Sequence, residues 1–479
     1  MRWQEVTVVS ASMVGMSFLV LGVFLLLGKW IRVISPSLQK LFIPSSLIGG
    51  FLALFLGPEV LGTIVSWTGY YDSSLSNGIF SQEILDVWRI LPGLFINIIF
   101  ATLFLGKKIP GIHDMWLVAG PQIAHGQTIA WGQYVFGILI TIFVLSPVFG
   151  IDPMAGALIE ISFEGGHGTA AGMAATFEEL GFAEAGDLAL GLATVGILFG
   201  VVLGILILNY GVRTGKTEVL QRTSQIGLDE RRQTGIIDFD ARESAGKITT
   251  RPESIEPLSL HFAYVGVAIG IGYVILQLLI QIEEITWGKA TGIYLLTYIP
   301  LFPLAMIGGI ILQMFLDRFD VYQTLDRNLM MRIQGLSLDI LITSAIATLS
   351  LTVIGNNLMP FIILALVGIF WNLAGFMLLG PRMMPSYWFE RSIGNFGQSM
   401  GMTASGLLLM KIADPDNRSP ALEGFGYKQL LFEPVVGGGV FTAASVPLIF
   451  HFGPMPLLIL TAIIMSFWLL LGLFYFGKK

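Results

Sequence analysis

The sequence contains no cysteine among its 479 residues, and only 12% of its residues are charged. The absence of cysteine excludes disulfides, thiolate metal sites and cysteine nucleophiles. A soluble domain carries about 25% charged residues. Because this chain has half that charge and is 54% hydrophobic, most of it must lie in lipid. The N-terminal residues also lack the basic region and cleavage site of a secretory signal, so we expect the first apolar run to be a membrane span.

Apolar runs long enough to cross the hydrocarbon core, which is ~30 Å thick, recur along the whole chain. They predict an all-α polytopic membrane protein with eleven spans. The expected spans are residues 7–29, 41–58, 88–106, 116–146, 185–209, 258–282, 292–316, 334–355, 359–380, 428–451 and 455–476. The one long polar stretch, residues 211–257, holds eight charged residues of each sign, and we expect it to be a cytoplasmic linker.

Two glycine-rich segments do not have the composition of ordinary spans. Residues 165–173 read GGHGTAAGM, and residues 394–406 read GNFGQSMGMTASG. Irregular backbone is tolerated at membrane depth only where it is buried in protein or lines an aqueous cavity. Transporters bind ions and substrates at such broken helices. We therefore expect re-entrant hairpins at about 154–180 and 386–411, with a binding site where their crests approach each other.

The distribution of lysine and arginine predicts the orientation. If the N-terminus is outside, 21 of the 26 basic residues, Lys428 among them, fall in cytoplasmic segments. The large outer loop expected at 59–86 then has acidic residues and no lysine or arginine. This bias is the positive-inside rule. It predicts a multi-pass protein of the cytoplasmic (inner) membrane, with its N-terminus outside and its C-terminus in the cytoplasm.

The two halves of the chain match each other at three places, in the same order. The matched sets are Pro44, Gly49 and Gly50 with Pro303, Gly308 and Gly309 (offset 259), Gly93, Leu94 and Asn97 with Gly335, Leu336 and Asp339 (offset 242), and Gly168, Gly172 and Met173 with Gly397, Gly401 and Met402 (offset 229). They predict one repeat over 1–210, a second over 258–454, and an additional C-terminal helix over 455–479. Five spans in the first half would leave the second repeat inverted.

Three motifs resemble one known family. The segments IPSSLIGG at 43–50, FEGGHGTAAGMA at 163–174 and FGQSMGMTASG at 396–406 are similar to those of the sodium/glutamate symporters. The resemblance covers nearly the whole chain apart from the linker and the last span. It implies a homodimer in which a transport domain moves against a fixed scaffold, as an elevator.

Candidate ligands for Na⁺ follow from its preference for oxygen. Backbone carbonyls at half-helix ends and hydroxyl groups supply such ligands. The candidates are Gly165, Thr169, Asn97, Asp339 and Gly397. Asn97 and Asp339 are included because they occupy matched repeat positions within predicted spans. The alternative is that the glycines only permit a tight turn and that Asp339 faces the interface.

Candidate substrate ligands lie on both crests. Hydroxyl and amide groups suit a carboxylate or an amino group, and a half-helix N-terminus favours an anion. The candidates are Gly166, His167, Gly168, Thr169, Gln398, Ser399, Thr403, Ser405 and Arg391, the last as a two-point partner for a distal carboxylate. Alternatively, Arg391 is a positive-inside anchor and His167 a hydrogen-bonding core residue. Glu160 and Glu164 flank the first crest, and ionisable residues at membrane depth are functional candidates.

The sequence thus predicts a secondary transporter that couples Na⁺ to uptake of glutamate or a related small anionic amino acid. Na⁺ is the expected coupling ion, and we expect no organic cofactor and no nucleic acid partner. One alternative is a di- or tricarboxylate carrier of the citrate type with the same architecture. Others are an intramembrane hydrolase using Ser399 and His167, and a channel.

Overall fold

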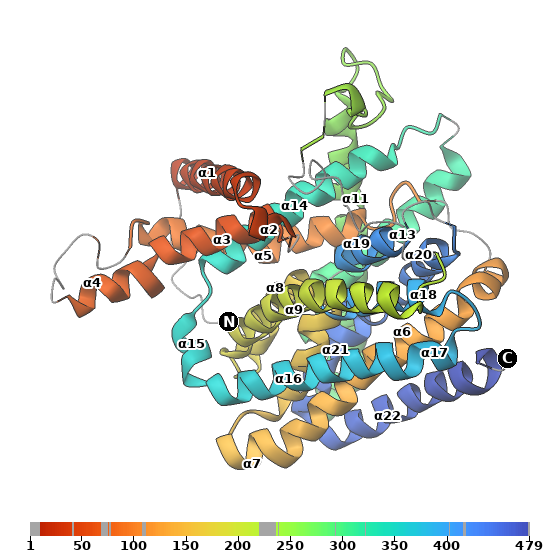
Figure 1. The fold of residues 1–479 in the computed structure, drawn as a ribbon. Coiled ribbons are helices and arrows are strands. Elements are labelled where there is room, and N and C mark those ends of the chain that lie inside the picture. Colours follow the sequence, from red (N-terminus) through yellow and green to blue (C-terminus); the bar gives the residue numbers. More distant parts are fainter. Residues whose placement is uncertain are drawn as a thin grey trace. The chain divides into compact units, whose positions relative to one another are not determined.

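The computed structural model describes residues 10–40, 43–68, 75, 78–107, 112–219, 236–237, 239–292, 294–320, 322–401, 403–414 and 418–477. Within these ranges every regular element is a helix. Residues 220–235 and 238 of the predicted linker, and residues 69–74 and 76–77 of the predicted outer loop, lie outside the described residues. Figure 1 shows the helices, coloured along the sequence. Packing divides the chain into two units. The first comprises residues 1–96, 229–242 and 335–352, and the second comprises 97–228, 243–334 and 353–479. This division leaves the predicted repeat boundaries untested.

Ten helices in the described part of the chain are long and apolar enough to span a membrane. They are Ala11–Ile34, Ser45–Trp67, Gln82–Thr102, Val118–Phe149, Ala185–Thr214, Pro257–Thr291, Leu301–Phe319, Arg327–Ala347, Leu358–Met383 and Pro454–Phe476. Each corresponds to a predicted span. Several have shifted ends: the helix from Pro257 runs nine residues beyond the expected span, to Thr291, and the span expected at 334–355 lies at Arg327–Ala347. The helix from Ser45 runs on to Trp67, through residues expected in the outer loop, and the span expected at 292–316 becomes a long helix only at Leu301.

Local signals set several helix ends. The first helix, α1 (Ala11–Ile34), begins where the Ser10 side chain accepts a hydrogen bond from the Met13 amide, which satisfies one of the free N–H groups of the first turn. α9 (Ala185–Thr214) ends at Gly215, whose φ of 68° lies in the left-handed region that glycine enters without steric cost. α11 (Pro257–Glu283) begins with proline, which has no amide hydrogen to leave unpaired.

The predicted span at 428–451 is wrong as a continuous helix. It is divided into α20 (Ala421–Phe432) and α21 (Val440–Phe452). The interruption contains Pro434, which has no amide hydrogen to donate, and Gly437 and Gly438, with φ of 87° and 102°. These φ values cannot continue a right-handed helix. We refer to residues 437–439 as the triglycine turn.

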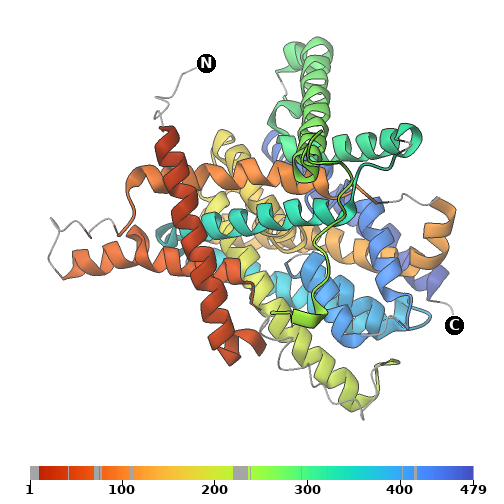
Figure 2. The same cartoon turned by 90° about the horizontal axis from the view of Figure 1, so that it is seen from above.

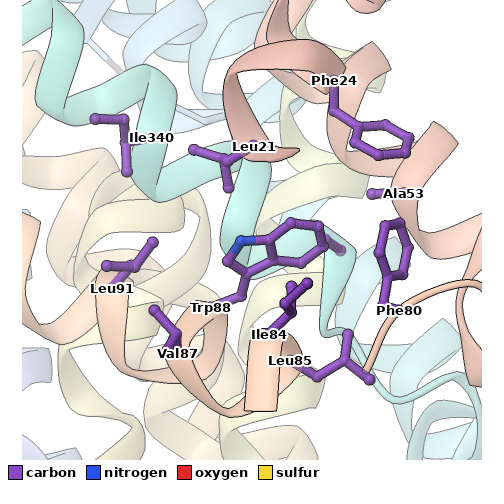
Figure 3. Close-up of a cluster of buried hydrophobic side chains, with 11 residues drawn as sticks. Leu21, Phe24, Ala53, Phe80, Ile84, Leu85, Val87, Trp88, Leu91 and Ile340 are labelled. Carbon is purple, nitrogen blue, oxygen red and sulfur yellow. The ribbon is translucent and has the colours of Figure 1, made fainter. Parts of the chain in front are cut away.

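The first unit is organised around Trp88 of α5 (Gln82–Thr102). Its side chain is fully buried against Leu21, Phe24 and Phe80 (Figure 3), and its indole N–H donates to the Ser17 carbonyl of α1 at 3.1 Å. The donor of the indole is therefore satisfied although it is buried. This contact holds α1 against α5.

Close helix crossings recur in the two units. In the first unit α1 crosses α3 (Ser45–Leu56; Figure 2), and a Cβ built on Gly28 would lie 2.6 Å from the Gly49 amide nitrogen. In the second unit α11 crosses α13 (Leu301–Phe319), and a Cβ on Gly272 would lie 2.6 Å from the Leu304 carbonyl oxygen. Only glycine allows backbones to approach this closely.

The matched glycines make corresponding contacts as well. Gly50 packs against the Thr343 carbonyl of α14 (Arg327–Ala347) in the first unit, and Gly309 packs against the Ala101 carbonyl of α5 in the second. The offset of 259 carries Gly50 onto Gly309, and the offset of 242 carries Ala101 onto Thr343. The contact between Gly50 and Thr343 therefore corresponds to the contact between Gly309 and Ala101.

The two glycine-rich segments are each broken into shorter helical pieces. The first has short helices at Pro153–Ala157 and Glu160–Glu164, followed by α8 (Gly166–Glu179), with the break at Gly166, whose φ is 71°. The second has α18 (Trp388–Ser399) and α19 (Thr403–Ala413), which pack against each other. Whether either segment is re-entrant in a membrane stays a prediction.

The third sequence match does not join equivalent positions. Gly168 follows the break of the first segment and lies inside α8, whereas Gly397 precedes the break of the second and faces Gly406 across the two arms. The first turn therefore lies at 165–166, ahead of Gly168.

Candidate functional site

A buried lysine joins the two glycine-rich segments within the second unit. The Nζ atom of Lys428, on α20, donates to Gln398 Oε1 at 2.7 Å and lies 3.3 Å from Glu164 Oε1. Glu164 directly precedes the first break, and Gln398 lies at the C-terminal end of α18. Lys428 is 1% exposed. The structure thus brings both crests to a single ammonium group.

The assignment of Lys428 to a cytoplasmic loop is therefore wrong. The stem of its side chain packs on Gly126 of α6 (Ile112–Ile140), where a Cβ would lie 2.5 Å from Lys428 Cε. α20 packs against both α6 and α18, and this packing carries the lysine inward. In the sequence, Lys428 stands at the start of a predicted span, where a buried lysine and a cytoplasmic positive-inside anchor look the same.

A second carboxylate, that of Glu160, holds the triglycine turn. Its Oε1 atom accepts from the Gly437 amide at 2.8 Å and from the Thr442 hydroxyl at 2.9 Å, while the hydroxyl of Tyr134 donates to Oε2. Glu160 is completely buried. Three groups, from the triglycine turn, α21 and α6, are thereby fixed around a single side chain, which sets the shape of the interrupted helix.

The triglycine turn lies directly beside the first crest. A Cβ built on Gly438 would lie 2.6 Å from the Thr169 hydroxyl oxygen, and one on Gly437 would lie 3.3 Å from Glu164 Cγ. The carbonyl groups of residues 436–438 accept no hydrogen bond from the described residues. Such carbonyls are suitable ligands for a hard cation.

The predicted residues of the first crest have mixed surroundings. The Thr169 hydroxyl donates to the Gly165 carbonyl at 2.9 Å, which leaves its oxygen able to bind a cation. His167 Nε2 lies 2.9 Å from the Thr194 hydroxyl of α9, while its Nδ1 has no hydrogen-bond partner among the described residues. Gly166 forms the break between the helix Glu160–Glu164 and α8, and Gly168 follows Gly165 by three residues.

At the second crest, the Ser399 carbonyl accepts from Gln133 at 2.8 Å and from Asn372 at 2.6 Å. The Ser399 hydroxyl has no partner among the described residues. Thr403 accepts from Gln429 at 2.9 Å. Ser405 is buried on α19.

One predicted residue, Arg391, lies away from the junction around Lys428. Arg391 precedes Gln398 by seven positions on α18, about 10 Å along the helix axis at 1.5 Å per residue. It is buried and interacts electrostatically with Glu218, at the start of the linker. Asp339 belongs to the first unit, where it interacts with Ser46, and Asn97 is the first residue of a segment of the second unit.

Comparison with known proteins identifies the family. A sequence model of the sodium/glutamate symporters matches residues 93–411, which is more than half of the chain. The chain belongs to the sodium/glutamate symporter family. It is 25% identical over 421 residues to a protein of Escherichia coli strain K12 named sodium/glutamate symporter, and equally to one of Shigella flexneri. Each alignment covers 86% of this chain and 90% of the relative.

This symporter is a transporter, so the hydrolase alternative with Ser399 as nucleophile is set aside. The family match ends at residue 411, before Lys428, the triglycine turn and Thr442. The sequence carries two signals of these residues. One is a lysine at the edge of a predicted span, and the other is the segment EPVVGGG at 433–439.

A second lysine accompanies the carboxylates of the symporter. Lys107, just beyond α5, interacts electrostatically with Glu433 at the end of α20. Burial lowers the pKa of Lys107, the neighbouring Arg327 lowers it further, and the Glu433 carboxylate opposes that shift. Glu433 interacts in turn with Lys428 and Glu164. Lys107, Glu433, Lys428 and Glu164 thus form a series of alternating charge that ends at the junction of the two crests.

Proposed function

We propose that this symporter couples the inward movement of Na⁺ to uptake of glutamate or a related small anionic amino acid. The observation that carries the proposal is the junction at Lys428, where Glu164 and Gln398 from the two glycine-rich segments meet beside the unpaired carbonyls of the triglycine turn. Oxygen ligands for Na⁺ and polar groups for a carboxylate and an amine lie together there. The names of the two relatives support the same substrates.

The binding roles follow from this arrangement. Thr169, the carbonyls near Gly165 and the triglycine turn are the proposed Na⁺ ligands, because they present oxygen atoms without a fixed positive charge. Gln398, Ser399 and Thr403 are the proposed substrate ligands on the other crest.

We also propose that the chain is built from two inverted repeats, that the glycine-rich segments are re-entrant hairpins, and that the protein works as a homodimeric elevator in the cytoplasmic membrane. The corresponding contacts of Gly50 with Thr343 and of Gly309 with Ala101 support the repeats. The charge bias supports an outside N-terminus and a cytoplasmic C-terminus.

Accumulation of an anionic substrate requires a coupled driving ion, and Na⁺ meets that need. Glutamate carries a net charge of about −1, so its entry against an interior-negative potential costs about 2.3 kcal/mol per 100 mV. One Na⁺ cancels this cost. A second Na⁺ makes the potential itself a driving force.

Uptake into proteoliposomes tests the proposal. Radiolabelled l-glutamate should accumulate, with saturation, when Na⁺ is outside, and should not when K⁺ or choline replaces Na⁺. Equal uptake in K⁺ and Na⁺ would overturn the coupling. Competition by citrate or succinate without competition by glutamate would instead favour the carboxylate carrier. Currents too large for a saturable carrier would indicate a channel.

A further inference from the structure

The environment of the Lys428 ammonium is that of a small bound cation. Its two polar neighbours are oxygen atoms, Glu164 Oε1 and Gln398 Oε1, one from each glycine-rich segment. The Phe425 ring lies 6.0 Å from Nζ and offers its electron-rich face. Carboxylate and amide oxygens are also the ligands that a hard monovalent or divalent ion takes. The lysine therefore occupies a position that would suit a free cation.

Glu164 requires such a cation. Its side chain is 3% exposed, and a buried carboxylate without a partner is strongly destabilising. Lys428 is the one basic group that the described residues place in an ion pair with it. Removal of the lysine leaves a buried negative charge and two oxygen atoms in an enclosed polar site. That charge is compensated either by protonation of Glu164 or by a bound cation, and the inward Na⁺ gradient supplies Na⁺ for the second.

A tethered cation differs from a transported one in a measurable way. Lys428 moves with the protein and returns with it, so it adds nothing to the charge carried across the membrane in a complete cycle. A Na⁺ at the same position would enter with the substrate and leave inside. The second carboxylate oxygen, Glu164 Oε2, has no hydrogen-bond partner among the described residues, so the ion pair leaves it available for another ligand.

We propose that Lys428 is a built-in cation that takes the place of one transported Na⁺ at Glu164, and thereby makes the Na⁺ requirement of each substrate molecule smaller by one. This inference rests on the proposed Na⁺-coupled symport. It assigns Lys428 as a positioning residue that sets stoichiometry by joining the two crests, and it assigns Glu164 and Gln398 as the ligands of that cation.

The decisive variant is Lys428→Met, which keeps the length of the side chain and removes its charge. Transport by the variant should depend on Na⁺ with a logarithmic slope larger by about one, because each additional ion bound adds one power of the ion concentration. The charge moved per glutamate should also rise by about one elementary charge. Purified protein without substrate should gain more thermal stability from Na⁺, relative to choline, than wild type does.

Two control variants separate charge from structure. Lys428→Arg keeps the positive charge and should keep the wild-type Na⁺ slope. The double variant Glu164→Gln/Lys428→Met removes both charges and should lose the additional Na⁺ dependence. If Lys428→Met is not recovered folded, Lys428→Gln takes its place, since its amide can still donate to Gln398.

The possible outcomes divide clearly. A steeper Na⁺ slope in Lys428→Met that is abolished by Glu164→Gln supports the inference. An unchanged slope with weaker glutamate affinity overturns it and makes Lys428 a receptor for the substrate carboxylate. A slope that stays steep in the double variant also overturns it, because the additional Na⁺ is then not at Glu164. Failure of Na⁺-driven uptake in wild type would instead refute the proposed function, whereas Na⁺ stabilisation of the purified variants can be measured without transport.

Discussion

The Thr442 hydroxyl donates to Glu160 Oε1 at 2.9 Å. The Thr442 hydroxyl oxygen itself accepts hydrogen bonds from the Gly437 and Gly438 amides, at 3.1 and 3.2 Å. A hydroxyl group has one hydrogen to donate and two lone pairs that accept. All three are used here. Thr442 therefore couples the buried carboxylate to the backbone of the triglycine turn, and the conformation of that turn depends on a single side-chain oxygen.

Thr442→Val should remove this coupling while nearly preserving the shape of the side chain. Gly438 loses the acceptor of its amide, and Gly437 and Glu160 each lose one bond. Loss of a partner costs about 1–3 kcal/mol for each buried group left unsatisfied. We expect a lower Tm in detergent and strongly reduced uptake. Thr442→Ser retains the hydroxyl and should behave nearly as wild type; equal behaviour of the two variants would show that the oxygen is dispensable.

Much of the fold was predictable because membrane spans depend on hydrophobicity, which the composition of a segment reveals directly. Continuous apolar runs found ten helices of the described chain, and the matched glycines of the Pro44 and Pro303 segments proved to make corresponding contacts. The span at 428–451 failed because hydropathy averages over its length. Neither Pro434 nor the triglycine turn lowers that average enough to mark a break.

The site was less predictable, since it depends on pairings between distant segments. Glycines and hydroxyls near residues 165–169 and 398–405 were proposed from their local pattern, and their roles stay a prediction. Lys428 was missed because a buried lysine and a loop lysine look alike until the partner, Glu164, is brought beside it. Arg391 resembled a substrate ligand in sequence, but the helix carries it away from the crest towards Glu218.

Gly438→Ala should disrupt the contact between the triglycine turn and the first crest. The φ of 102° is unfavourable for any residue with a Cβ, and that Cβ would lie 2.6 Å from both Thr169 Oγ1 and Phe100 Cζ. Backbone strain of this kind costs about 1–3 kcal/mol, so both Tm and apparent Na⁺ affinity should fall.

Gly426→Ala is the matched control for this substitution. Gly426 lies inside α20, is exposed, and has nothing within 4 Å of an added Cβ. Alanine favours the helix by up to about 1 kcal/mol, so this variant should be as stable as wild type or more so. If Gly438→Ala transports with wild-type Na⁺ dependence, the turn does not contribute to the ion site.

The close helix crossings can be tested in the same way in both units. Gly28→Val and Gly272→Val insert a branched side chain where backbone atoms of α3 and α13 already lie within 2.6 Å of the Cβ position. Overpacking costs about 1–3 kcal/mol or more, and we expect both variants to lose thermal stability to a similar extent. Gly22→Val and Gly266→Val, on the same two helices, meet nothing within 4 Å and are the controls. A large loss in only one of the first pair would argue against equivalent roles.

The final prediction concerns orientation, and the absence of native cysteine makes it simple to measure. Ser12, at the start of α1, and Ser244, in the linker, are both exposed. The charge bias places the first outside and the second in the cytoplasm. In intact cells a membrane-impermeant thiol reagent should label Ser12→Cys at once, and should label Ser244→Cys only after permeabilisation.

The same reagents can then test the hairpins from each side. Ala171 and Ser399 are buried near the two breaks, yet a carrier that alternates access must open such positions to water in part of its cycle. Cysteines there should react with a small aqueous reagent, at a rate that Na⁺ plus glutamate reduces, because substrate closes the site. Phe24→Cys, in the core of the first unit, should remain unreactive throughout. If Ala171→Cys and Ser399→Cys are as inert as Phe24→Cys under every condition, then neither segment lines an aqueous pathway, and the alternating-access site between the crests is refuted.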